Sequence, residues 1–155
     1  MRMRTAPEQL SQRNIELQGR AVAALNAREV PAGLLAPGFA LKDCASAVAD
    51  YTYRGEAGWR DWMNDIFEEF SGTAQLRIEQ IVAATDEFVV ASFCIDGASA
   101  RLGTPLSFRW TGVTWFQSGR ATNAAGYSTR REALEAVRRE ARDRGRVLGP
   151  DLAAA

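Results

Sequence analysis

The sequence predicts an α+β fold in which N-terminal helices pack on a curved, mostly antiparallel sheet to form a cone, with a further helix at the C-terminus. Two observations carry this prediction. Apart from a short segment at 39–53, apolar residues recur at helical spacing as far as residue 72, and from residue 74 to residue 127 they follow strand patterns instead. Helices followed by a run of strands are typical of the α+β class. The 155 residues fit one domain, 1–155, with its core at about 8–140 and a flexible tail at 144–155.

The first helix is expected to begin at a capping box, because Thr5 and Glu8 can satisfy each other's free backbone N–H groups. A stripe of small and apolar residues follows at helical spacing. Beyond the stripe, Pro31 and the glycines at 33 and 38 bracket a predicted short second helix around Leu34–Leu35. The stripe of the first helix consists of Leu10, Leu17, Ala21, Ala24 and Leu25.

Residues 39–53 indicate two short strands or one irregular pair, and residues 53–58 indicate a loop. The clearest amphipathic helix of the chain comes next, since large apolar side chains recur every three or four residues and charged side chains occupy its other face. Ser71–Gly72 provides a C-terminal stop for this helix. Its apolar face consists of Trp59, Trp62, Met63, Ile66, Phe67 and Phe70.

The strands are expected at 75–83, 87–95, 105–117 and 120–127. In the strand expected at 105–117, the apolar side chains change from one face to the other along the strand. Leu106, Phe108 and Trp110 share one face, whereas Val113 and Trp115 fall on the other, and we expect a bulge near Thr111–Gly112 to reconcile them. A last helix follows a second possible capping box at Thr129 and Glu132, with an apolar stripe of Ala133, Leu134, Val137 and Ala141.

Composition excludes several classes of function. Lys plus Arg equals Asp plus Glu at 19 each, which does not favour nucleic-acid binding. No apolar run approaches the roughly 20 residues of a membrane span, and the first residues do not resemble a secretory signal, so we expect a cytoplasmic protein. Cys44 and Cys94 have no metal-site spacing and are expected to be free thiols. The chain has no histidine, and we expect neither a metal nor a cofactor.

Three phrases resemble the nuclear transport factor 2-like superfamily, in particular its SnoaL-like and ketosteroid-isomerase-like branch. They are VAALNARE in the first helix, YRGEAGWRDWM at the start of the long amphipathic helix, and GYSTRREALEAV after the sheet. The segment GVTWFQSGRA fits the strand–turn–strand before the last phrase. The resemblance covers about residues 8–140 and implies a cone with an interior cavity. Members include isomerases, polyketide cyclases, dehydratases, epoxide hydrolases, ligand binders and assembly modules, so it does not assign an activity.

The resemblance argues against the best-known chemistries of the superfamily. Ala21 and Gly112 fall where the steroid isomerases have their two oxyanion donors, each worth on the order of 3 kcal/mol. The polar residues of the epoxide hydrolases correspond to Phe93, Ile95 and Gly126, and the dehydratases depend on a histidine that this chain lacks. The third isomerase position, the general base, falls on Asp43. Asp43 is either a catalytic base facing the cavity or a solvated aspartate at a strand end.

Strand parity and the resemblance together predict which side chains face the cavity. The predicted cavity is lined by aromatic side chains on one side and by small side chains on the other. This lining suits a flat apolar ligand such as a polyketide or a steroid-like ring system. The alternative is that the same side chains simply fill a core. The predicted ligand-binding residues are Val22, Leu25, Tyr53, Trp59, Trp62, Ile66, Phe93, Ile95, Phe108, Trp110, Gly112 and Ala124.

Three functions are compatible with these observations. The first is a protein that binds an apolar small molecule without turnover. The second is a cofactor-free isomerase, cyclase or dehydratase of an apolar carbonyl compound, with Asp43 as general base. The third is a structural dimer module with a filled interior. Arg77 and Arg109 are expected on the outer face of the sheet, where exposed Val113 and Trp115 would fit a homodimer.

Overall fold

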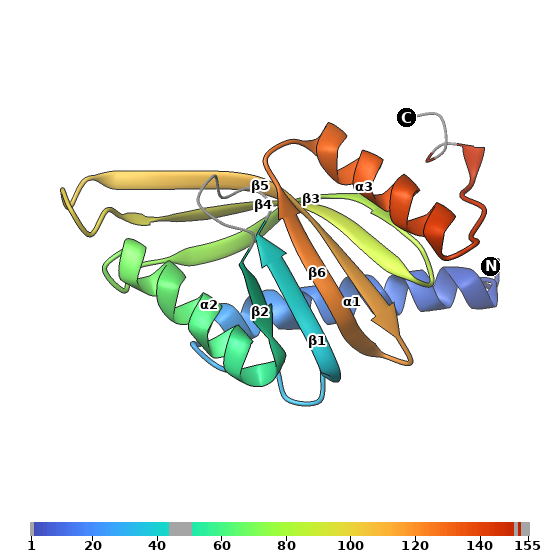
Figure 1. The fold of residues 1–155 in the computed structure, drawn as a ribbon, viewed down its shortest axis with the longest axis horizontal. Helices are drawn as coiled ribbons and strands as arrows, with labels where there is room; N and C mark the ends of the chain where they lie inside the picture. Colours follow the sequence, from blue (N-terminus) through green and yellow to red (C-terminus); the bar gives the residue numbers. More distant parts are fainter. Residues whose placement is uncertain (1, 44–50, 151, 153–155) are drawn as a thin grey trace.

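The computed structural model describes residues 2–43, 51–150 and 152. A single sheet of six strands, in the order β2-β1-β6-β5-β4-β3, curves around the first two helices without closing (Figure 1). Neighbouring strands are antiparallel, apart from the parallel pair of β1 and β6. The fold is α+β, as predicted. Its elements are α1 (Ala6–Asn26), β1 (Leu35–Asp43), β2 (Thr52–Arg54), α2 (Gly55–Glu69), β3 (Gln75–Ala84), β4 (Phe88–Ala98), β5 (Pro105–Gln117), β6 (Arg120–Tyr127) and α3 (Arg130–Asp143).

Helix α1 begins at the predicted capping box. The Glu8 amide donates to Thr5 Oγ1 at 3.4 Å, and the Thr5 amide donates to Glu8 Oε2 at 2.7 Å. Two asparagines fix the helix antiparallel to β3. Asn14 Nδ2 donates to the Thr85 carbonyl at 3.0 Å, and Asn26 exchanges two hydrogen bonds of 2.8 Å with the backbone of Leu76. The buried face of α1 is therefore held at one position over the sheet.

Helix α2 carries the predicted apolar face and covers β1 and β2. It begins at Gly55 directly after β2, which ends at Arg54, so the predicted loop at 53–58 is wrong. Gly55 has a φ of 64°, which allows the sharp turn from strand to helix. A Cβ on Gly58 would lie 2.5 Å from the backbone carbon of Tyr53, so the close approach of β2 and α2 requires glycine there.

The predicted short helix around Leu34–Leu35 is also wrong, because Leu35 begins strand β1. The cause is a long-range pairing. The Ala121 amide donates to the Leu34 carbonyl at 2.7 Å, and β1 then pairs with β6. Phe39 and Leu41 are buried on one face of this strand. Local glycine and proline positions could not reveal a partner some 80 residues away in the chain.

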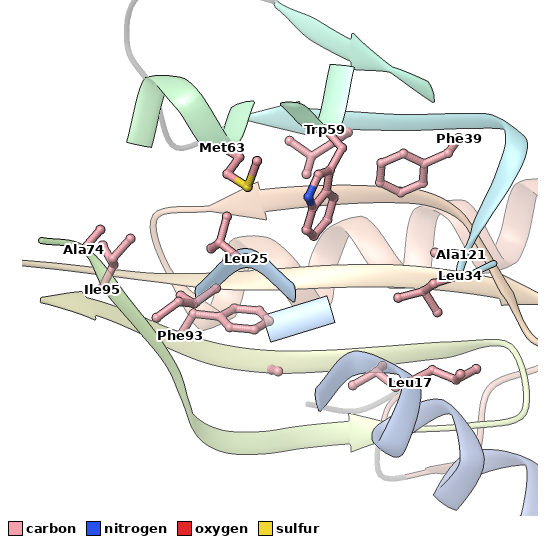
Figure 2. Packing of buried hydrophobic residues seen from close by; sticks show 14 of the residues in the cluster. Leu17, Leu25, Leu34, Phe39, Trp59, Met63, Ala74, Phe93, Ile95 and Ala121 are labelled. Carbon is pink, nitrogen blue, oxygen red and sulfur yellow. The ribbon is translucent and has the colours of Figure 1, made fainter. Parts of the chain in front are cut away.

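The sheet is covered on both faces, and each face has its own apolar cluster. Helices α1 and α2 cover the inner face, whereas α3 contacts β4, β5 and β6 from the outer side (Figure 1). In the inner cluster, Trp59 and Met63 point from α2 towards Leu25 of α1, with Phe39 beside Trp59 (Figure 2). Strand β4 contributes Val89 and Ala91 to the inner cluster and Val90 to the outer one, which explains its continuous apolar run.

Strand β5 has no bulge at Thr111–Gly112, so that prediction is wrong. Its pairing with β4 keeps one register from Phe88–Trp115 to Ala98–Pro105, and the irregularity lies in the pairing with β6, between Trp115 and Phe116. The parity change needs no bulge because both faces of this half of the strand are buried. Val113 and Trp115 are only 3% and 4% exposed beneath α3, so they do not form the exposed dimer patch expected for them.

The rest of the outer face is polar. Arg77 pairs with Asp96, and Arg109 Nε lies 2.9 Å from Glu79 Oε1, which places both arginines outside the cavity as predicted. Within the stretch 144–155, Leu148 and Leu152 pack against the outer cluster, and the flexibility of that stretch stays a prediction. Across the described ranges 2–43, 51–150 and 152, no helix is long and apolar enough to cross a membrane.

Candidate functional site

A cavity of about 660 Å³ lies between the inner face of the sheet and helices α1 and α2. Residues from α1, β1, β2, α2, β3, β4, β5 and β6 line it. One predicted cavity residue, Leu25, is 1% exposed in the neighbouring core and does not line the cavity. The other predicted residues do line it: Val22, Asp43, Tyr53, Trp59, Trp62, Ile66, Phe93, Ile95, Phe108, Trp110, Gly112 and Ala124.

One wall of the cavity is a row of stacked aromatic rings on β4 and β5. The rings of Phe93 and Trp110 are 5.4 Å apart and inclined by 22°, and those of Trp110 and Phe108 are 5.7 Å apart and inclined by 29°. Two glycines make room for this row. A Cβ on Gly112 would lie 2.8 Å from the Phe93 ring, and a Cβ on Gly126 would lie 3.2 Å from the Trp110 ring. The position that carries an acid in the isomerases is thus covered here by an aromatic ring.

A second aromatic wall comes from α2. The rings of Trp59 and Trp62 are 5.2 Å apart and meet edge to face. Trp59 Nε1 donates to the Glu29 carbonyl at 3.1 Å, so the indole is fixed in place and its polar atom is satisfied. Ile66 lies one turn further along the same helix and also lines the cavity. Together, the two walls present mainly apolar surface to the cavity.

Polar side chains gather where β1, β2 and α2 meet. Asp43, Tyr53 and Asp65 all line the cavity there, and the Tyr53 hydroxyl donates to Asp65 Oδ2 at 2.8 Å. Burial raises the pKa of Tyr53 far above its ordinary value, and the hydrogen bond to Asp65 and the negative charges of Asp65 and Asp43 raise that pKa further. Tyr53 therefore stays protonated and orients the Asp65 carboxylate.

An adjoining hollow of about 360 Å³ shares Tyr53 and Asp65 with the cavity and is also lined by Tyr51, Asp61 and Asn64. The Tyr51 and Tyr53 rings meet edge to face at 4.7 Å. We refer to Asp43, Tyr53 and Asp65 as the polar end of the cavity. This polar end continues into a polar depression that residues of α2 line together with Tyr51 and Tyr53.

Sequence reasoning missed several lining residues. Asp65 belongs to the charged side chains that the sequence predicts on the other face of the amphipathic helix, although it follows Trp62 by three positions and so borders the apolar stripe. Leu34 falls in the segment predicted as a short helix, and Phe39 falls in the predicted irregular strand pair at 39–53, so the sequence does not place either side chain in the cavity. Gln18 gave no signal at all, since a glutamine beside a helical stripe usually faces water. In the structure Gln18 is 8% exposed and lines the cavity.

The chain matches no protein-family model and no curated protein sequence. Solved structures do match its fold. Bal32a, from a soil-derived mobile gene cassette, has a TM-score of 0.66 at 16% identity, over 82% of this chain and 97% of that chain. TerC, co-crystallised with polyporic acid, has a TM-score of 0.63 at 18% identity, over 79% of this chain and 98% of the TerC chain.

A nuclear transport factor 2-like protein of unknown function from Burkholderia pseudomallei has a TM-score of 0.62 at 15% identity, over 79% of this chain and 95% of that chain. These matches extend over nearly the whole length of each neighbour, and they agree with the architecture that the three sequence phrases implied. The chain therefore has the nuclear transport factor 2-like fold.

Proposed function

We propose that this protein binds a flat, largely apolar small molecule in the cavity, with the polar end contacting a polar group of that molecule. The observation that carries the proposal is the division of the cavity surface. Stacked rings of Phe93, Trp110 and Phe108 on β4 and β5 form one wall, whereas the polar end comes from other elements, β1, β2 and α2. A mostly apolar pocket with few, localised polar groups is the usual form of a small-molecule site.

The size of the cavity supports this proposal. Its volume of about 660 Å³ lies within the range of roughly 300–1,000 Å³ that is usual for ligand pockets. Ring ligands gain affinity there by removing apolar surface from water, at roughly 25 cal/mol per Å² before the entropic costs of binding are subtracted. The structural neighbour TerC was crystallised with polyporic acid, which also favours a small-molecule role within the SnoaL-like branch.

The first test measures the binding of naphthalene, both through the change in naphthalene fluorescence and by calorimetry. We expect a dissociation constant in the tens of micromolar, since about −0.6 kcal/mol per non-hydrogen atom is reasonable for a ligand of this size. The heat capacity change on binding should be negative, because apolar surface is buried. If saturating naphthalene produces no change in either measurement, the proposal is wrong.

A second candidate is a cofactor-free isomerase, cyclase or dehydratase with Asp43 as general base. The observation that favours it is the position of Asp43 on the cavity wall, close enough to Tyr53 for its charge to affect the pKa of that hydroxyl. A carboxylate at such a site can take a proton from the carbon next to a carbonyl group and return it elsewhere on the enolate.

The enzymatic candidate is tested with 2-tetralone in D₂O, by following exchange of the hydrogens next to its carbonyl by NMR. If Asp43 is a base, the wild-type protein accelerates exchange and Asp43→Asn reduces that acceleration by about 100-fold or more. Asp86→Asn, on an exposed turn, is the matched control and should leave the rate unchanged. Equal rates with and without the wild-type protein would reject a base at Asp43 and leave the binding proposal standing.

Two further parts of the proposal concern assembly and location. We propose that the protein pairs as a homodimer through the outer sheet face beyond α3, where Arg77, Asp96, Arg109 and Glu79 provide paired charges. We also propose a cytoplasmic location, for which the free thiol of buried Cys94 is the supporting observation.

A further inference from the structure

Three tryptophans line the cavity, and the N–H group of each indole can only donate a hydrogen bond. Trp59 Nε1 donates to the Glu29 carbonyl at 3.1 Å, so this indole already has its partner. Trp62 Nε1 and Trp110 Nε1 make no hydrogen bond within the described residues, and neither nitrogen is fully buried. These two N–H groups therefore remain available to another partner.

The nitrogen-bearing edge of the Trp110 ring lies over Gly126 of β6. A Cβ on Gly126 would be 3.2 Å from Trp110 Cδ1 and 3.6 Å from Trp110 Nε1. On the other side of β6, Asp43 is the residue of β1 that pairs with Gly126, and it also lines the cavity. A hydrogen-bond donor and a carboxylate therefore come from the strands on either side of one glycine, which leaves the space between them free of a side chain.

The Trp110 N–H group is a donor on an otherwise apolar wall, because its neighbours there are the rings of Phe93 and Phe108. A hydroxyl or amine of a ligand can donate directly to a carboxylate at the polar end, whereas a carbonyl oxygen can only accept. The Tyr53 hydroxyl is not free for such an oxygen, since it donates to Asp65 Oδ2 at 2.8 Å. A carbonyl oxygen that leaves water without gaining a donor is costly, so it is expected to bind where the Trp110 N–H group can reach it.

We propose that Trp110 is a specificity-determining residue whose Nε1–H group donates to a carbonyl oxygen of the bound molecule, over Gly126 and beside Asp43. The ring system of the ligand then lies against the aromatic wall of β4 and β5. This inference rests on the proposed binding function and makes it more specific, because it identifies the ligand class as fused-ring ketones. The assignment of Trp110 holds whether or not Asp43 removes a proton from such a ketone.

The experiment compares 2-tetralone with tetralin, which have the same fused rings and differ by one carbonyl group. Trp110→Phe removes the N–H group and makes the ring smaller, so the affinities for both probes should fall. The affinity for 2-tetralone should fall about threefold to tenfold further than that for tetralin, because one hydrogen bond is lost as well. Trp62→Phe is the matched control. It removes the other available N–H group of the cavity tryptophans and should lower both affinities by the same factor.

An NMR measurement on the wild-type protein makes the test independent of how well the variants fold. The indole N–H resonance of Trp110 should move further downfield with 2-tetralone than with tetralin, because a hydrogen bond to oxygen deshields the proton. The resonance of Trp115, which packs in the outer cluster, should move with neither probe. If Trp110 responds alike to both probes, or Trp110→Phe lowers both affinities by the same factor, the assignment is wrong although the binding function stands. If the wild-type protein binds neither probe, the binding function is wrong and the assignment falls with it.

Discussion

Replacing Trp115 with alanine should lower the free energy of unfolding by about 3–5 kcal/mol, the usual cost of deleting a buried large aromatic side chain. Trp115 is 4% exposed, and its ring lies 5.0 Å from that of Phe88. Arg144, which caps α3, places its guanidinium carbon 4.1 Å from the centre of the indole. The truncation would therefore remove the centre of the contact between α3 and the sheet. Urea unfolding followed by circular dichroism measures the change.

Phe108→Ala provides a matched control on the same strand. Phe108 is 49% exposed on the inner face, so its loss should cost less than about 1 kcal/mol. Sedimentation of the Trp115→Ala protein should show the same oligomeric state as the wild type, because the side chain is covered by its own chain. A variant that kept its stability but changed its oligomeric state would instead indicate that Trp115 faces a second copy, and would contradict the packing of α3 described above.

The elements that the sequence predicted correctly are those with local signals. The capping residues Thr5 and Glu8 mark the start of α1, and the regular spacing from Trp59 marks the apolar face of α2. Apart from the predicted loop before α2, the errors concern β1 and β5, where the outcome depends on distant parts of the chain. Strand β1 forms because β6 offers it a partner, and Trp115 is buried because α3 folds back over it. Neither fact is encoded in the neighbouring residues.

The residues of the candidate site likewise include some that local sequence signals predicted and others that depend on distant parts of the chain. The resemblance put Phe93 and Gly112 on the inner face, and alternation along the strand carried Trp110 to the same face, because parity in an extended chain is local information; all three side chains line the cavity. Gln18 and Asp65 could not be found in this way. Both lie at the edge of a helical stripe, where a polar residue faces either water or the interior depending on what packs opposite. Only the assembled sheet decides between these two environments.

Replacing Ala124 with phenylalanine should weaken naphthalene binding by about 100-fold while keeping or slightly raising thermal stability. Ala124 lies on the inner face of β6, paired with Leu41 on one side and Thr114 on the other, and it lines the cavity. A phenylalanine suits a strand, and its ring would enter the open space between the two aromatic walls. The ring would remove the space that naphthalene needs and bury its own apolar surface, which is worth about 2 kcal/mol at most.

This variant distinguishes a binding cavity from a filled core. If the cavity of about 660 Å³ is open in solution, the ring is accommodated, so naphthalene affinity falls and stability does not. If the interior is instead filled by its own side chains, the same ring overpacks it and should destabilise the protein by about 1–3 kcal/mol. That second result, combined with no naphthalene binding by the wild type, would favour a structural dimer module. Ala57→Phe, at an exposed position of α2, adds the same ring outside the cavity and should alter neither binding nor stability appreciably.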